Sequence, residues 1–175
     1  ASISNDLAVG LKIPADAAEN VKLHYGYALS RDVLVKEQVE LKKFFPEARA
    51  TVARRFISEI IEVRLAEILE FVNNELKLLG KYGELPGGAV FVGGGAKMPG
   101  LMDLARQELK LPSQVGLPME DEWTLEKENL REAIEDPEYV SALGLVLWGA
   151  NGEGHSPRMP ISRFSIRNAL RYFLP

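Results

Sequence analysis

The longest regular pattern of apolar residues lies between residues 51 and 79. Apolar side chains recur there three or four positions apart, as one face of an amphipathic helix requires. Gly80 and Gly83 follow the pattern, and glycine commonly ends a helix. The sequence therefore predicts a helix over 51–79 that is packed along a groove or broken once, because it exceeds the average helix length. Its apolar positions are Phe56, Ile57, Ile60, Ile61, Val63, Leu65, Ile68, Leu69, Val72, Leu76 and Leu79.

Three shorter segments have helical patterns. Residues 2–11 contain an apolar stripe that ends at Leu11, with Ser4, Asn5 or Asp6 as the expected N-terminal cap. A second helix is predicted from about Asp16 to Gly26, after the interruption at Pro14. Residues 139–150 are strongly apolar and rich in small side chains, which suits a helix in a buried layer.

Short apolar runs predict three strands, over residues 33–35, 89–92 and 114–117. The charged segment 36–49 is expected to turn near Pro46. Residues 119–138 contain nine acidic and two basic side chains, and a solvated face is the expected role of such a run.

The predicted strand 89–92 leads into Gly93, Gly94 and Gly95, and a helix is expected to open with Pro99 near its first turn. Glycine lets a ligand approach the backbone, and a helix N-terminus attracts phosphate. No Gly-Lys-Ser/Thr follows and the glycines are contiguous, so the segment is neither a P-loop nor a dinucleotide fingerprint. Two interpretations stay open, a nucleotide-binding loop and a tight turn between strand and helix.

The composition is that of a globular protein, and it excludes several kinds of chemical site. The 175 residues are 46% hydrophobic and 26% charged, which suits one domain or one large piece of a longer protein. A net charge of −4 gives no reason to expect nucleic acid as a partner. No cysteine is present, and the two histidines are far apart, so disulfides, thiolate chemistry and a histidine metal cluster are not expected. The chain begins at Ala1 without a signal peptide, and we expect it to begin inside a longer protein.

The last 25 residues differ from the rest. Residues 151–160 have the composition of a linker, and 161–175 predict a helix with an apolar face beside a row of arginines. Such a helix suits an anionic membrane surface, and the alternative is a helix that folds back onto its own domain or a partner. The membrane-binding residues are predicted to be Phe164, Ile166, Leu170, Phe173, Leu174, Arg163, Arg167 and Arg171.

Several segments, in order and over nearly the whole chain, resemble the bacterial cell-division family FtsA. Residues 2–11 are similar to its "T-N-D-I-A-x-G-L" helix, and 17–28 to its "E-x-x-K-x-x-Y-G-x-A" stretch. Residues 85–100 resemble its adenosine motif, and 136–145 its last core helix. The basic tail is similar to its membrane-targeting helix. No run of 18 apolar residues predicts a membrane span.

The resemblance implies an α/β fold, the second half of an actin-like ATPase. Subdomain 2A would comprise residues 1–12 and 86–150, with subdomain 2B inserted over 13–85, followed by the linker 151–160 and the amphipathic helix 161–175. The implied cofactor is ATP, with magnesium held by the half of the protein that is missing here.

Residue roles follow from the same resemblance. Glu19 and Lys22 would face the ribose and adenine, although an i, i+3 surface ion pair is the alternative. Gly93, Gly94 and Gly95 would lie under the ribose and α-phosphate. The remaining cofactor-binding residues would be Gly26, Ala96 and Met98, the last two near the base.

The implied function is that of an adaptor. The parent protein would bind ATP, form filaments and tether the ring of the tubulin-like protein FtsZ to the cytoplasmic face of the cell membrane at the division site. The C-terminal peptide of FtsZ would dock on 2B, where Arg49, Arg54 and Arg55 either meet an acidic peptide or form a solvated face. No catalytic residue is identified, and any activity would be slow ATP hydrolysis by the full-length protein.

Two other classes of protein share part of this pattern. A PilM-like scaffold of type IV pilus assembly shares the actin-like core and a similar glycine loop. A sugar-kinase or acetate-kinase type of enzyme shares the superfamily, but no paired carboxylates stand out. The Ser-Asn-Asp helix, the segment Tyr25-Gly26-Tyr27-Ala28 and the arginine-rich tail favour FtsA.

Overall fold

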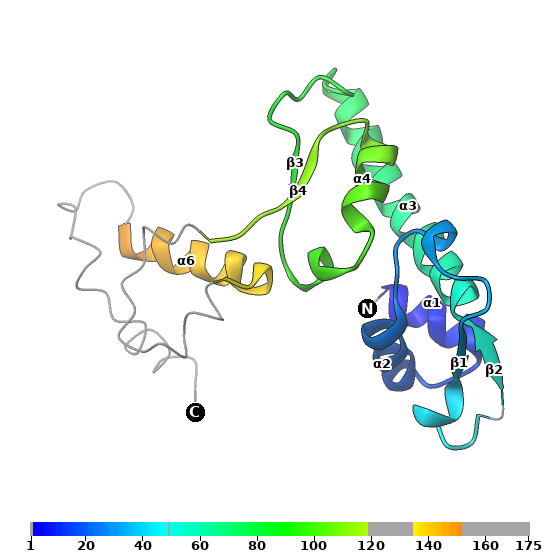
Figure 1. Cartoon of the computed structure of the whole chain (residues 1–175). Coiled ribbons are helices and arrows are strands. Elements are labelled where there is room, and N and C mark those ends of the chain that lie inside the picture. Colours follow the sequence, from blue (N-terminus) through cyan, green and yellow to red (C-terminus); the bar gives the residue numbers. More distant parts are fainter. Residues whose placement is uncertain (1, 49, 119–134, 152–175) are drawn as a thin grey trace. The chain divides into compact units, whose positions relative to one another are not determined.

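The computed structural model describes residues 2–48, 50–118 and 135–151, which form a mixture of helices and short strands (Figure 1). The chain divides into two compact units. The first unit contains Ala1–Ala89 and Met98–Gln114, and the second contains Val90–Lys97 and Val115–Pro175. The predicted tail helix and most of the predicted acidic segment lie outside the described residues. Among the described helices, none is long and apolar enough to cross a bilayer.

The longest element of the first unit is α3 (Arg54–Leu78), a continuous helix of 25 residues. The predicted helix is confirmed and is not broken, but it begins three residues later than expected. Thr51–Ala53 instead forms strand β2, which pairs antiparallel with β1 (Gln38–Glu40), Val39 opposite Val52. The chain leaves the helical direction at Gly80, whose φ of +64° favours glycine. The buried side chains of α3 are those of Ile57, Ser58, Ile61, Leu65, Leu69 and Asn73.

Two shorter helices, α1 (Ser2–Leu11) and α2 (Ala15–Tyr25), pack against each other and against α3. Both confirm the sequence predictions, but the expected cap of α1 is wrong. Ser4, Asn5 and Asp6 lie inside the helix rather than at its start. This placement matters because Ser4 is buried and Asp6 reaches Arg64 of α3.

Helix α4 (Leu101–Leu109) packs against α3, and the Nδ2 of Asn73 donates to the carbonyl oxygen of Glu108 at 2.7 Å. Pro99 lies near the first turn of this helix, as expected, and a turn through Gly100 at φ +79° precedes Leu101. A Cβ on Gly100 would lie 2.7 Å from the Tyr27 ring. Glycine is therefore required at this position by both backbone conformation and packing.

The strand predicted over 33–35 is wrong. Leu34 and Val35 are exposed, and the segment that pairs with β2 is Gln38–Glu40, in which Val39 alone is buried. The other two strands are confirmed in shorter form, as β3 (Ala89–Phe91) and β4 (Ser113–Val115), which make a two-stranded sheet. The turn expected near Pro46 is also confirmed.

In the second unit, the 3₁₀ turn η3 (Gly94–Lys97) contacts the 3₁₀ turn η6 (Pro137–Tyr139), which leads into α6 (Val140–Asn151). The helix predicted over residues 139–150 is confirmed within one residue of its expected start. Its expected place in a buried layer is not, because the described part of the chain buries none of its side chains from Val140 to Ala150. Leu145 is 68% exposed and Trp148 is 67% exposed.

We predict that Asp6→Asn destabilises the first unit in a pH-dependent manner. The hydrogen bonds from Arg64 hold the pKa of the Asp6 carboxyl below its usual value, outweighing a smaller opposite effect of burial. A lowered pKa in the folded state contributes stability above the pKa of the unfolded state, about 4, and this contribution is lost as the pH falls through the folded value. Thermal melting should show a lower melting temperature for the variant at pH 7 and a difference that shrinks progressively as the pH falls below about 4.

The matched control is Asp32→Asn, because the ion pair that Asp32 makes within the described residues is with its exposed neighbour Arg31, at 3.8 Å. Such a pair contributes little. An Asp6→Asn effect that stays constant from pH 7 to pH 3 would contradict the assignment to the Arg64 ion pair.

Candidate functional site

Helices α1 and α2 bring together three polar side chains, those of Ser4, Glu19 and Lys22. The Nζ of Lys22 lies 2.6 Å from Oε1 of Glu19 and donates to Oγ of Ser4 at 3.3 Å. The Ser4 hydroxyl in turn donates to Oε2 of Glu19. The i, i+3 ion pair expected as the alternative for Glu19 and Lys22 is present, with the Lys22 side chain 17% exposed, and Ser4 of the neighbouring helix joins it.

The Glu19 carboxyl is the outermost group of this cluster, with 42% of its side chain exposed. Its pKa is lowered, first by the hydrogen bond from Lys22 and then by the one from Ser4. At neutral pH it is therefore an ionised acceptor. A carboxylate and an ammonium group side by side can accept from and donate to the hydroxyl groups of a sugar.

Gly26 and Met98 lie next to this cluster in the first unit. The Gly26 N–H donates to the Lys22 carbonyl oxygen at 2.9 Å and closes the last turn of α2. A Cβ on Gly26 would lie 2.4 Å from that oxygen and 3.1 Å from Sδ of Met98. The structure thus places four of the predicted residues, Glu19, Lys22, Gly26 and Met98, in the first unit.

The other four predicted residues, Gly93, Gly94, Gly95 and Ala96, lie in the second unit. Gly93 has a φ of +88°, which favours glycine, and its N–H donates to the Pro137 carbonyl oxygen at 2.7 Å. A Cβ built on Gly93 or Gly95 meets nothing within 4 Å. The backbone at these two glycines therefore faces space that a ligand can approach.

Lys97 holds this loop against the segment before α6, and the sequence analysis missed it. Its Nζ lies 2.7 Å from Oδ2 of Asp136 and 3.3 Å from Oε2 of Glu138. Both contacts raise the pKa of Lys97, and the hydrogen bond to Asp136 has the larger effect. Lys97 in turn lowers the pKa of Asp136. Asp136 and Glu138 are therefore ion-paired, which corrects the expectation of a merely solvated acidic run at these two positions.

In the first unit, the cluster supplies a carboxylate and an ammonium group, which suit the hydroxyl groups of a sugar such as ribose. In the second unit, taken by itself, the backbone at Gly93 and Gly95 is open. The described residues contain no group of three or more histidine or acidic side chains that could hold a metal ion.

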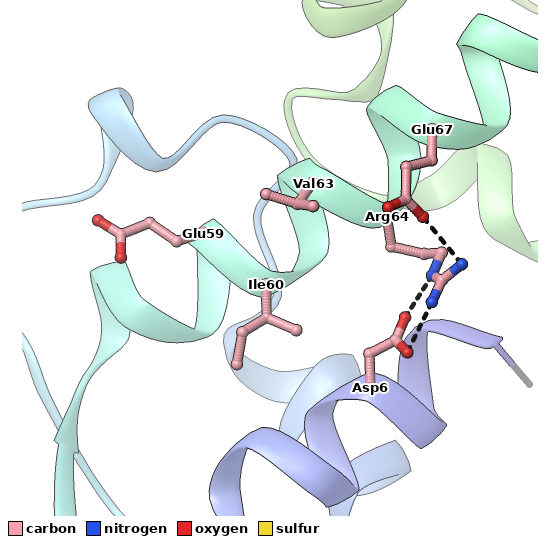
Figure 2. A pocket seen from close by; sticks show the side chains of 6 residues that line it. All are labelled: Asp6, Glu59, Ile60, Val63, Arg64 and Glu67. Carbon is pink, nitrogen blue, oxygen red and sulfur yellow. Dashed lines mark hydrogen bonds and ion pairs between the residues drawn. The ribbon is translucent and has the colours of Figure 1, made fainter.

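A second candidate site is a pocket of about 310 Å³ beside α3, here called the α3 pocket. Figure 2 shows Arg64 pointing from α3 toward Asp6 of α1, with the carboxylate of Glu67 on its other side. Arg64 donates to both carboxylate oxygens of Asp6 and lies 2.9 Å from Glu67. The remaining lining residues are Glu59, Ile60 and Val63, so the pocket combines apolar side chains with charges of both signs.

The arginines singled out in the sequence have other contacts. Arg54 pairs with Glu37 at 2.8 Å and donates to the Tyr25 carbonyl oxygen, which fixes the start of α3. Arg55 lies 3.6 Å from Glu59, and Arg49 falls outside the described residues. The α3 pocket could not be found from local sequence patterns, because Asp6 and Arg64 are 58 positions apart.

Comparison with known proteins identifies relatives over most of the chain. Residues 1–144 match the family model described as "Cell division protein FtsA". The cell division protein FtsA of Pseudomonas aeruginosa is 26% identical over 160 residues, which cover 91% of this chain and 37% of the relative. FtsA of Borreliella burgdorferi is 34% identical over 149 residues, and FtsA of Bacillus subtilis is 32% identical over 145 residues. Each of these two matches covers 83% of this chain, and they cover 34% and 30% of the relatives.

The chain therefore spans about a third of the length of the curated relatives it matches. The family match extends over residues 1–144 of 175 and includes every nucleotide-binding residue predicted from the sequence. On this evidence, the chain belongs to the FtsA family of cell division proteins.

Proposed function

We propose that this chain is part of an FtsA protein that binds ATP, assembles into filaments and tethers the FtsZ ring to the cytoplasmic face of the cell membrane at the division site. The observation that carries the proposal is the family match over residues 1–144. Family membership implies the actin-like fold, and the mixed helices and strands agree with it. The pilus-scaffold and kinase alternatives are not favoured, because the curated relatives reported above are FtsA proteins.

Within that fold we assign residues 1–12 and 86–150 to subdomain 2A and residues 13–85 to subdomain 2B. Residues 151–160 are assigned as a linker and 161–175 as a membrane-binding helix. The assignment rests on the order of motifs in the sequence.

ATP is the proposed cofactor, and this chain's part is to bind and orient the nucleoside. Glu19 and Lys22 are assigned to the ribose and adenine, with Gly26, Ala96 and Met98 nearby. Gly93, Gly94 and Gly95 are assigned to the ribose and α-phosphate. Two observations support this assignment, the polar cluster on α1 and α2 and the open space at Gly93 and Gly95.

Gly95→Ala tests the glycine loop. The added Cβ meets no atom within 4 Å and Gly95 needs no positive φ, so the variant should fold normally. A nucleotide close to the backbone would meet that Cβ, and ATP affinity should fall about tenfold, equivalent to about 1.4 kcal/mol. Titration of the full-length protein with a fluorescent ATP analogue measures the effect.

Gly149→Ala is the matched control, because it too has open space and an ordinary φ but lies in α6, outside the residues assigned to the nucleotide. Equal ATP affinity in wild type and Gly95→Ala would show that the nucleotide does not approach this loop.

The α3 pocket is the proposed docking site of the FtsZ C-terminal peptide on 2B. Its apolar side chains Ile60 and Val63 are surrounded by Arg64 and three carboxylates, so it can accept a peptide that carries both apolar and charged side chains. Five of its six lining residues lie on α3, within 2B, the subdomain for which the resemblance implied this docking role. The basic residue that lines the pocket is Arg64, which is paired with Asp6 and Glu67, whereas Arg54 anchors the start of α3.

Val63→Glu tests this docking site. Val63 is 60% exposed and lines the pocket, so a carboxylate there should leave the fold intact and oppose burial by a peptide. The affinity for a synthetic FtsZ C-terminal peptide should fall about tenfold, as measured by fluorescence anisotropy. The matched control is Val72→Glu, which places the same change on α3 outside the pocket, at a side chain 43% exposed. If both variants bind like wild type, the peptide docks elsewhere.

Membrane attachment is proposed for residues 161–175, on the basis of their alternating apolar and arginine positions. Deletion of these residues from the full-length protein should abolish flotation with anionic vesicles. A variant with Arg163, Arg167 and Arg171 changed to glutamine should float more weakly and lose its preference for anionic lipid. Equal flotation of the intact and shortened proteins would rule out this segment as the anchor.

A further inference from the structure

We propose that Ser4 is a positioning residue that gives the nucleotide site its preference for ribose over deoxyribose. The inference rests on the nucleotide binding proposed above and adds a residue for which the sequence predicted only a helix cap. Ser4 lies on α1, one helix away from Glu19 and Lys22, and only 4% of it is exposed.

The contacts determine the direction of the Ser4 hydroxyl. A hydroxyl has one hydrogen to donate, whereas an ammonium group can only donate and an ionised carboxylate can only accept. The Lys22 ammonium therefore donates to Oγ of Ser4, and the Ser4 hydrogen must be directed to Oε2 of Glu19. One buried hydroxyl thus connects the cation to the carboxylate and fixes both.

The cluster also orients the Glu19 carboxylate. Oε1 is held by Lys22 at 2.6 Å and Oε2 is held by Ser4, so both oxygens have a protein partner on their inner side. Each carboxylate oxygen retains a second lone pair, and the Glu19 side chain is exposed to solvent. Two oriented acceptors beside one ammonium donor match the two neighbouring hydroxyls of a ribose ring.

Without the Ser4 hydroxyl, Oε2 has lost its inner partner and the carboxylate can rotate about its last side-chain bond. Loss of the Ser4 hydroxyl should weaken binding of the ribose hydroxyls. A mobile carboxylate must be ordered when the ribose binds, and this ordering costs part of the binding free energy. Contacts to the base and the phosphates are common to ATP and its deoxy analogues, so a change in them would not alter the ratio of their affinities. The effect of Ser4 should therefore depend on which sugar hydroxyls are present.

The test compares wild type, Ser4→Ala and Ser4→Thr in the full-length protein, with ATP, 2′-deoxy-ATP and 3′-deoxy-ATP titrated by calorimetry. Wild type should prefer ATP over at least one deoxy analogue by about tenfold or more. Ser4→Ala should reduce this preference for ATP over the deoxy analogue to about twofold or less, mainly by weakening the binding of ATP. Ser4→Thr keeps a hydroxyl at the same atom and should restore most of the ratio.

Ser58→Ala is the matched control. Ser58 is completely buried in α3, and its hydroxyl makes no hydrogen bond within the described chain, so this variant removes a buried serine without removing a contact. It should leave the ATP-to-deoxy-ATP ratio unchanged.

Three results would overturn the inference, and they separate it from the function it rests on. If wild type binds ATP and both deoxy analogues with equal affinity, the cluster does not recognise the ribose hydroxyls. If Ser4→Ala weakens all three nucleotides by the same factor, Ser4 acts on the fold and not on the sugar. If wild type binds no nucleotide, the proposed ATP binding and this inference both fail.

Discussion

Ile57 and Ile61, on the N-terminal half of α3, are completely buried where α3 meets α1 and α2, together with Leu7 and Val21. A long helix gains most of its stability in a protein from packing of its apolar face. This layer therefore determines where α1 and α2 lie. Both candidate sites of the first unit depend on it, because Ser4 and Asp6 are on α1, Glu19 and Lys22 are on α2, and Arg64 is on α3.

Helix α1 contributes to the two sites through side chains two residues apart. Ser4 is directed toward α2 and Asp6 toward α3, because positions two residues apart lie about 200° apart around a helix and so face different sides. A displacement of α1 along its axis would therefore alter the polar cluster and the α3 pocket together. The two proposed activities, nucleotide binding and peptide docking, share this helix as a physical connection.

Local patterns predicted the elements whose structure is set by nearby residues. The helical stripes of α1, α2 and α3, the glycines that end α3 and the pairing of Glu19 with Lys22 three positions on were all available from spacing. The errors involve contacts across long sequence distances. β2 was merged with α3 and β1 was placed at residues 33–35, because a strand of three residues is defined by its partner rather than by its own composition. Arg64 with Asp6, and Lys97 with Asp136, could not be paired from spacing at all.

Helix α6 has a consequence for how the protein is handled. Its sequence is almost entirely apolar, yet the described part of the chain leaves Leu145 and Trp148 largely open to water. A contiguous apolar surface of this kind promotes association until another surface covers it. Shortened forms that end near this helix are consequently prone to aggregate, and their solubility depends on whether α6 is covered or removed.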